Sequence, residues 1–104
     1  MLGLNQKILV RLIQHSKQAI HRQYLKVRKE FLMSHELCEA QVPGICNYVA
    51  CDVHHRAGRC GKLLVATEYF MAVCRFCHLW IGDHVAEARA QGWIIYKTNY
   101  ECRT

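Results

Sequence analysis

Three histidines in two short segments have the type and spacing expected of a metal-dependent reaction centre. His54 and His55 are adjacent at the end of a run of β-forming residues, and His78 directly follows a Cys-x-x-Cys motif. Adjacent residues on a strand point to opposite faces, so His54 and His55 cannot both bind one ion from a regular strand. We therefore expect one imidazole to bind a divalent ion together with His78, and the other to accept a proton from water. The alternative is that the three rings are only structural.

Four cysteines are predicted to form a separate zinc site. Cys74 and Cys77 are spaced so that one turn can direct both sulfurs at one ion, and Cys38 and Cys46 flank the Pro43-Gly44 turn, which would bring that second pair together. Four thiolates around a tetrahedral zinc leave no position for substrate. This site would therefore stabilise the fold and take no part in a reaction.

The other cysteines, together with the absence of export signals in the sequence, bear on the cellular compartment that we expect. We expect Cys51 and Cys102 to be small buried residues, and a zinc pair of Cys51 with Cys60 is the less favoured alternative. The first ten residues contain an apolar run too short for a signal peptide. No segment approaches the length of a membrane span. A cytoplasmic, reducing environment is expected, where Cys-x-x-Cys indicates metal binding.

Charged residues near the histidine pair are candidates for positioning a phosphate and the ring of His54. Arg56 and Arg59 follow the pair in a loop with Gly58, and the guanidinium fork suits a phosphate. Ordinary surface arginines are the competing interpretation. Asp52 shares a face with His54 at period two, so we expect its carboxylate to orient that ring through the free nitrogen.

The elements that must position these residues begin with a long helix. Residues 4–35 contain no Gly and no Pro. At about 100° per residue they form one apolar stripe. Its members are Leu9, Ile13, Ser16, Ile20, Tyr24, Val27 and Phe31. The helix would be roughly 45 Å long, more than the following domain can cover alone. The chain therefore divides into a helical arm, 1–36, and a domain, 37–104.

The arm is strongly basic. Residues 1–29 carry seven of the chain's 14 Lys and Arg residues and no acid, within a formal net charge of +6. An unmixed basic face favours nucleic acid as the partner. The predicted DNA-binding residues are Lys7, Arg11, Arg22, Lys26 and Lys29. Other interpretations remain open: the basic face is only solvated, the helix forms a homodimer, it contacts a host protein, or it lies on a membrane surface.

The domain is predicted to be α+β. A strand is expected over 47–55, a basic loop over 56–61 and a second helix over 77–91, with Gly92 as its C-terminal cap. The apolar residues 93–96 are expected to form a closing strand. A chain of 104 residues buries a modest core, so a structural metal ion is an expected source of stability.

These residues together resemble the HNH endonuclease family, in particular its small phage-type members. The matching positions are Cys38 to Cys46 with the Pro-Gly turn, Asp52 to Arg59, Leu63-Leu64, Tyr69, Cys74, Cys77 with His78, Trp80-Ile81, His84, Ala88 and Gly92-Trp93. The resemblance implies a ββα-metal fold, in which a β-hairpin and a helix surround one divalent ion beside a four-cysteine zinc. It implies that His54 and His78 are the metal ligands and His55 the general base.

Two positions depart from the family pattern. Many members carry a further histidine four residues after the one matching His78, where this chain has Gly82. His84, Asp83 or water would have to take its place. The Asn that braces the catalytic loop in the family falls at Tyr69. The long basic helix lies outside the resemblance.

The leading hypothesis is a metal-dependent DNA endonuclease that nicks or cuts double-stranded DNA in a phage context, in the host cytoplasm. It would use Mg²⁺, Mn²⁺ or Ni²⁺ at His54 and His78 and a structural zinc at the cysteines. The second hypothesis is a zinc-binding protein that keeps this scaffold and binds DNA without cleaving it, because Gly82 has removed a ligand.

Overall fold

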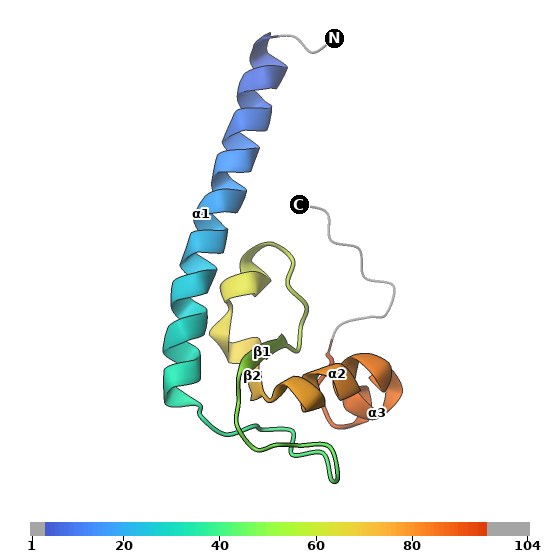
Figure 1. The fold of residues 1–104 in the computed structure, drawn as a ribbon. Helices are drawn as coiled ribbons and strands as arrows, with labels where there is room; N and C mark the ends of the chain where they lie inside the picture. The colour runs from blue at the N-terminus through green and yellow to red at the C-terminus, as the bar shows by residue number, and fades with distance from the viewer. Residues whose placement is uncertain (1–3, 96–104) are drawn as a thin grey trace.

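The computed structural model describes residues 4–95, and its dominant element is the helix α1, Leu4–Ser34. The helix predicted over 4–35 is confirmed to within one residue. The chain leaves the helix where the Nδ1 of His35 bonds the Phe31 carbonyl at 2.9 Å and its ring stacks on Phe31. This contact satisfies one of the carbonyls that the last turn leaves without an intrahelical partner. In Figure 1 the N-terminal half of α1 extends well beyond the other described elements.

Two short antiparallel strands form the sheet. Strand β1, Asp52–His55, pairs with β2, Phe70–Val73, in a register that sets His54 opposite Met71 and His55 opposite Phe70. The predicted strand began five residues earlier, at residue 47. Tyr48 instead has a φ of +73°, which no strand accommodates, and Val49 makes only an isolated bridge to Leu37.

The 56–69 connection between the strands contains two 3-10 helices, η1 over Gly61–Val65 and η2 over Thr67–Tyr69.

Two helices, α2 (Arg75–Asp83) and α3 (Val85–Ala90), replace the single helix predicted over 77–91. The first begins two residues early because the Cys74 sulfur caps it by accepting the Cys77 amide at 3.3 Å. The break falls at His84, whose φ of −130° is not helical.

The C-cap of α3 is Gln91, and the predicted glycine follows it directly, where Gly92 has the left-handed φ of +81° that ends the helix. The predicted closing strand is wrong for residues 93–95, which form none, and Tyr96 lies outside the described residues.

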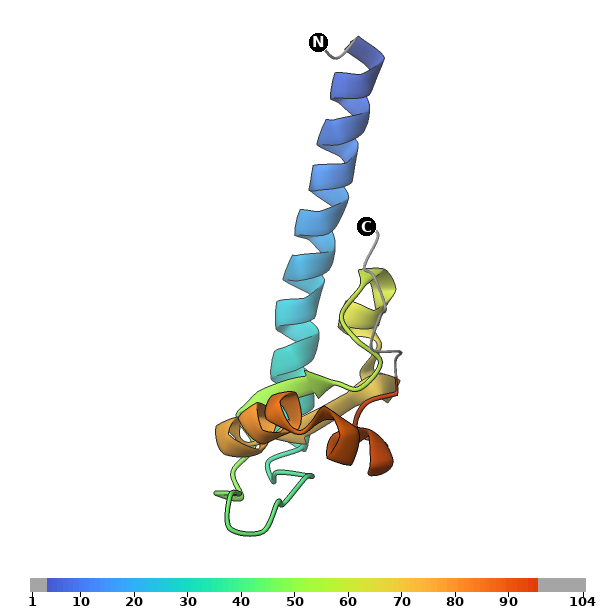
Figure 2. The ribbon, with the colours of Figure 1, turned by 90° about the vertical axis from the view of Figure 1, so that its right-hand side faces the viewer.

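The sheet lies between α1 on one side and the α2–α3 pair on the other (Figure 1), and in Figure 2 the α2–α3 pair lies in front of the strands. Because successive side chains of a strand point to opposite faces, each face of the sheet has its own set of packed residues. Val53 and Phe70 pack with Tyr24 of α1, and Met71 and Val73 pack with the buried cysteines and Ile81.

Only the C-terminal half of the apolar stripe on α1 is covered by the domain. Tyr24 is 7% exposed, whereas Leu9 is 57% exposed. No described helix combines the length and the apolar character that a membrane span requires.

Candidate metal centre and imidazole cavity

The structure brings the four predicted zinc ligands together. The sulfurs of Cys38, Cys46, Cys74 and Cys77 all lie within 4.8 Å of one another. An ideal tetrahedral zinc with bonds of about 2.3 Å has its sulfurs about 3.8 Å apart, so the cluster needs only a small contraction around an ion. Three of the four are fully buried, and Cys46 is half-buried. Among the side chains that the structure describes, this is the only group of three or more potential ligands that meets the geometric requirement for a metal site.

Backbone amides are already directed at the sulfurs. The Tyr48 amide donates to Cys46 at 3.2 Å, and the Cys77 amide donates to Cys74 at 3.3 Å. Burial raises the pKa of the Cys46 and Cys77 thiols. Burial acts the same way on Cys74, but the amides of Asn47 and Cys77 outweigh it and lower the pKa of that thiol to about 7. Amide donors stabilise thiolates, the form in which cysteine binds zinc.

The remaining cysteines lie outside this group. Cys51 is exposed, contrary to the expectation that it is a buried apolar residue. Its position at the entry to β1 turns its side chain away from both cores. Cys60 is not part of the four-sulfur cluster. Cys102 lies outside the described residues.

The three histidines line one cavity of about 480 Å³, together with Arg59 and Gly82. The ring centroids of His54 and His78 are 5.5 Å apart at an interplanar angle of 65°. Two imidazoles bound to one ion through nitrogens about 2.1 Å away would have centroids about 5 to 5.5 Å apart. The observed spacing therefore fits two ligands of one ion.

Each of these two rings has one nitrogen held by an oxygen. The Nε2 of His54 lies 2.6 Å from the Trp93 carbonyl, and the Nδ1 of His78 lies 3.1 Å from the Asp52 carboxylate. Because both oxygens only accept, each of these nitrogens carries the proton, and the other nitrogen of each ring has the lone pair that a metal ion requires. Burial lowers the pKa of His54, which favours the neutral ligand form.

His55 points to the other face of β1, as expected for adjacent strand residues. Its ring contacts Phe70 and Tyr24, with centroids 4.8 Å and 5.4 Å away. The Nε2 donates to the Leu64 carbonyl at 3.1 Å, so Nδ1 carries the lone pair. Burial lowers the pKa of His55, which keeps this ring neutral and able to accept a proton.

Asp52 has different partners from those predicted. Its carboxylate does not orient His54, but accepts from Arg75 at 2.7 and 3.0 Å and from His78. Both side-chain partners come from α2, which carries Arg75 and His78. Hydrogen bonds from Arg75 lower the pKa of Asp52. The carboxylate is therefore ionised and orients the ring of His78.

The two loop arginines differ in what they contact. The Arg56 guanidinium donates to the Glu68 carbonyl at 2.8 Å, and its amide donates to the Tyr69 carbonyl at 3.0 Å. Tyr69 thus braces the loop through its main chain. Arg59 is exposed, and its guanidinium carbon lies 5.4 Å from the centre of the Tyr24 ring. Arg59 is the arginine of this pair that lines the cavity.

Neither candidate for the missing third ligand lines this cavity. His84 stacks on Trp80 at 4.3 Å, and its Nδ1 bonds the Trp80 carbonyl at 2.9 Å. Gly82 does line the cavity, and a Cβ built on it would meet no atom within 4 Å.

The predicted DNA-binding cations lie along α1. Arg11, Arg22, Lys26 and Lys29 are exposed, and of Lys7 the structure describes only the backbone, within α1.

Four groups at the site were not predicted from the sequence. They are the carbonyls of Leu64 and Trp93, the guanidinium of Arg75 and the ring of Tyr24. Only Arg75 had a usable signal. A cation in the first turn of a helix opposes the helix dipole, which indicates a carboxylate partner nearby.

Comparisons with known proteins leave this geometry to be interpreted by its chemistry. No model of a protein family matches the chain, no curated protein is significantly similar to it, and no solved structure matches its fold.

Proposed function

We propose that this chain is a metal-dependent DNA endonuclease of the HNH type. The observation that carries the proposal is the pair of rings at 5.5 Å, His54 and His78, each with one nitrogen held by an oxygen and the other available to an ion. Two antiparallel strands followed by a helix agree with a ββα-metal arrangement, and the adjoining four-sulfur cluster agrees with the structural zinc of that family.

The residues of the cavity divide the work of phosphodiester hydrolysis. His55 accepts a proton from the attacking water through Nδ1, because its Nε2 is committed to the Leu64 carbonyl. Arg59 contacts a phosphate oxygen at the mouth of the cavity. His54 and His78 would hold a divalent ion such as Mg²⁺, Mn²⁺ or Ni²⁺. That ion supplies Lewis-acid stabilisation of the charge that develops on the phosphate and on the leaving oxygen.

Replacing His78 with Ala tests the proposal. We expect the Mn²⁺ concentration for half-maximal plasmid nicking to rise by more than about tenfold, because one of two protein ligands is lost. The matched control is His84→Ala, which removes an imidazole from the next turn of the chain without touching the cavity. An equal effect of the two substitutions would contradict the assignment of His78 as a ligand.

A second candidate function is DNA binding without cleavage. It is favoured by the presence of only two imidazole ligands in the cavity, with Gly82 on its wall. The zinc cluster would then maintain a scaffold for the basic helix.

The substitution Gly82→His distinguishes the two candidates. Position 82 is four residues after His78 on α2, so the new ring lies on the same helix face, and its Cβ meets no obstruction. We expect Mn²⁺ binding, measured by calorimetry, to tighten by about tenfold. Nicking that appears only in the variant would identify the natural chain as the non-cleaving form. Unchanged Mn²⁺ affinity in a folded variant would show that no ion binds beside His78.

A further inference from the structure

Three hollows of the surface meet at Arg59. One is the histidine cavity. A second, of about 450 Å³, lies between α1 and η1, and a third, of about 330 Å³, lies beside Arg28 and Arg75. Arg59 lines all three. A ligand bound at the histidines can therefore continue past Arg59 onto α1.

The lining of these hollows is almost free of negative charge. The hollow on α1 carries Lys17, His21, Arg59 and Lys62 and no acid. The only acid among the residues that line the three hollows is Asp52, which Arg75 already holds through two hydrogen bonds. The path past Arg59 is therefore suited to a chain of phosphates.

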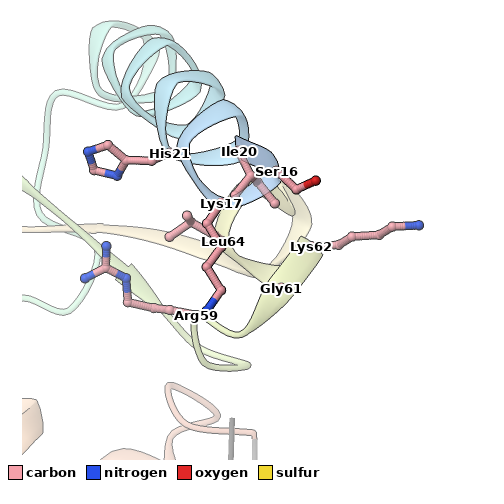
Figure 3. A pocket seen from close by; sticks show the side chains of 8 residues that line it. All are labelled: Ser16, Lys17, Ile20, His21, Arg59, Gly61, Lys62 and Leu64. Carbon is pink, nitrogen blue, oxygen red and sulfur yellow. The ribbon is translucent and has the colours of Figure 1, made fainter. Parts of the chain in front are cut away.

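The hollow on α1 also offers apolar surface. Ile20 and Leu64, both half-buried, line it between the cations. In Figure 3 the Lys17 side chain runs from α1 toward the segment that carries Arg59, Leu64 lies beside it, and Lys62 extends away from the helix. Aliphatic side chains can bury the apolar face of a base, and the neighbouring cations can bind its phosphate. Duplex DNA keeps its bases stacked inside, so only an unpaired nucleotide can use both.

We propose that the hollow between α1 and η1, lined by Lys17, Ile20, Lys62 and Leu64, binds an unpaired nucleotide that flanks the phosphate at the histidines. DNA with a single-stranded tail, such as a flap or an overhang, is then bound in preference to an uninterrupted duplex. The position of the cut relative to the tail rests on the proposed nuclease function, whereas binding of the tail does not. The exposed cations of α1 that lie outside this hollow, among them Lys26 and Lys29, supply affinity for DNA that does not discriminate between tailed and uninterrupted duplexes.

Fluorescence anisotropy with the zinc-loaded full chain tests this preference, without added Mg²⁺, Mn²⁺ or Ni²⁺ so that no cleavage intervenes. The probes are a blunt duplex and the same duplex with an oligothymidine tail. We expect the tailed probe to bind about tenfold tighter than the blunt one. The double variant Lys17→Ala, Lys62→Ala should reduce this advantage to about twofold or less, and should lower the salt slope for the tailed probe by about 1.4.

The matched control is Lys26→Ala, Lys29→Ala, which removes the same charge from exposed positions outside the hollow. This control variant should lose affinity for both probes by the same factor. All four lysines are exposed, so neither double variant removes packing from the core. The proposal is overturned if the wild type shows no preference for the tailed probe. It is also overturned if the Lys17, Lys62 variant loses affinity for both probes by the same factor.

Photocrosslinking gives an independent readout. A 5-iodouracil at the first unpaired position should crosslink to residues 16–21 or 59–64, and crosslinks confined to the outer face of α1 would contradict the proposal. Plasmid nicking then separates the two proposals. A tail preference without nicking in any divalent ion leaves the hollow assigned and removes the nuclease. Nicking that depends on His55, without a tail preference, does the reverse.

Discussion

We expect Cys74→Ser to abolish zinc binding at the four-cysteine cluster and to unfold the domain that follows α1. Cys74 is completely buried and contributes one of four converging sulfurs, so a hydroxyl there leaves the ion with three thiolates. Structural zinc sites contribute roughly 10 to 16 kcal/mol to folding in small domains, about as much as the whole stability of an average domain. Elemental analysis should find about one zinc per chain in the wild type and none in the variant, with loss of the cooperative thermal transition.

Cys51→Ser is the control for this prediction. Cys51 is exposed and lies outside the cluster, so the same chemical change there should leave the zinc content and the melting temperature unchanged. A Cys74→Ser variant that retains full zinc would show that the four sulfurs are not the binding site. Chelation of the wild-type metal should reproduce the unfolding without any substitution.

For the nuclease that we propose, we expect His55→Ala to lower the rate of plasmid nicking by about 10² to 10⁴, the range typical of a lost general base. The Leu64 carbonyl fixes the tautomer of this ring, and burial lowers its pKa and keeps it neutral, so its Nδ1 is free to take the proton. The effect should fall on kcat, because the proposed metal ligands His54 and His78 remain. Nicking is measured on supercoiled plasmid with Mg²⁺, Mn²⁺ and Ni²⁺ in turn.

His35→Ala is the matched control, because that ring is exposed at the end of α1 and away from the cavity. His55 packs against Phe70, so the zinc content and thermal transition of the His55 variant must be shown to survive. If wild type and His55→Ala are equally inactive while both retard DNA on a gel, the enzyme assignment fails and the binding function stands.

The helix α1 could be predicted because its signals are local. Residues 4–34 have a continuous helical periodicity and nothing that interrupts it, and the structure follows them. The break between α2 and α3 had no such signal. It falls at His84, where stacking on Trp80 and a bond to the Trp80 carbonyl outweigh helix continuation. Neither contact can be read from periodicity.

The sheet and the zinc cluster illustrate two further limits. The four sulfurs could be paired correctly from spacing alone, because each pair flanks a tight turn. The observed strand is shorter than predicted because Tyr48, two residues after the Cys46 ligand, takes a positive φ as its amide donates to the Cys46 sulfur.

Within the imidazole cavity the alternation of His54 and His55 was predictable, because it follows from strand geometry. Their carbonyl partners were not. Leu64 and Trp93 offer main-chain oxygens, which every residue has, and only the tertiary fold selects them. The misassigned partner of Asp52 has the same origin, because the competing side chain came from α2.

The contact between His54 and Trp93 has a consequence for the timing of assembly. The chain returns to β1 after Gly92, where the Trp93 carbonyl meets His54 and the Ile95 amide donates to the Arg56 carbonyl at 2.9 Å. These two partners are among the last described residues that a ribosome adds. A nascent chain still lacking them holds His54 without its acceptor, so the cavity is completed only after Ile95 has left the exit tunnel.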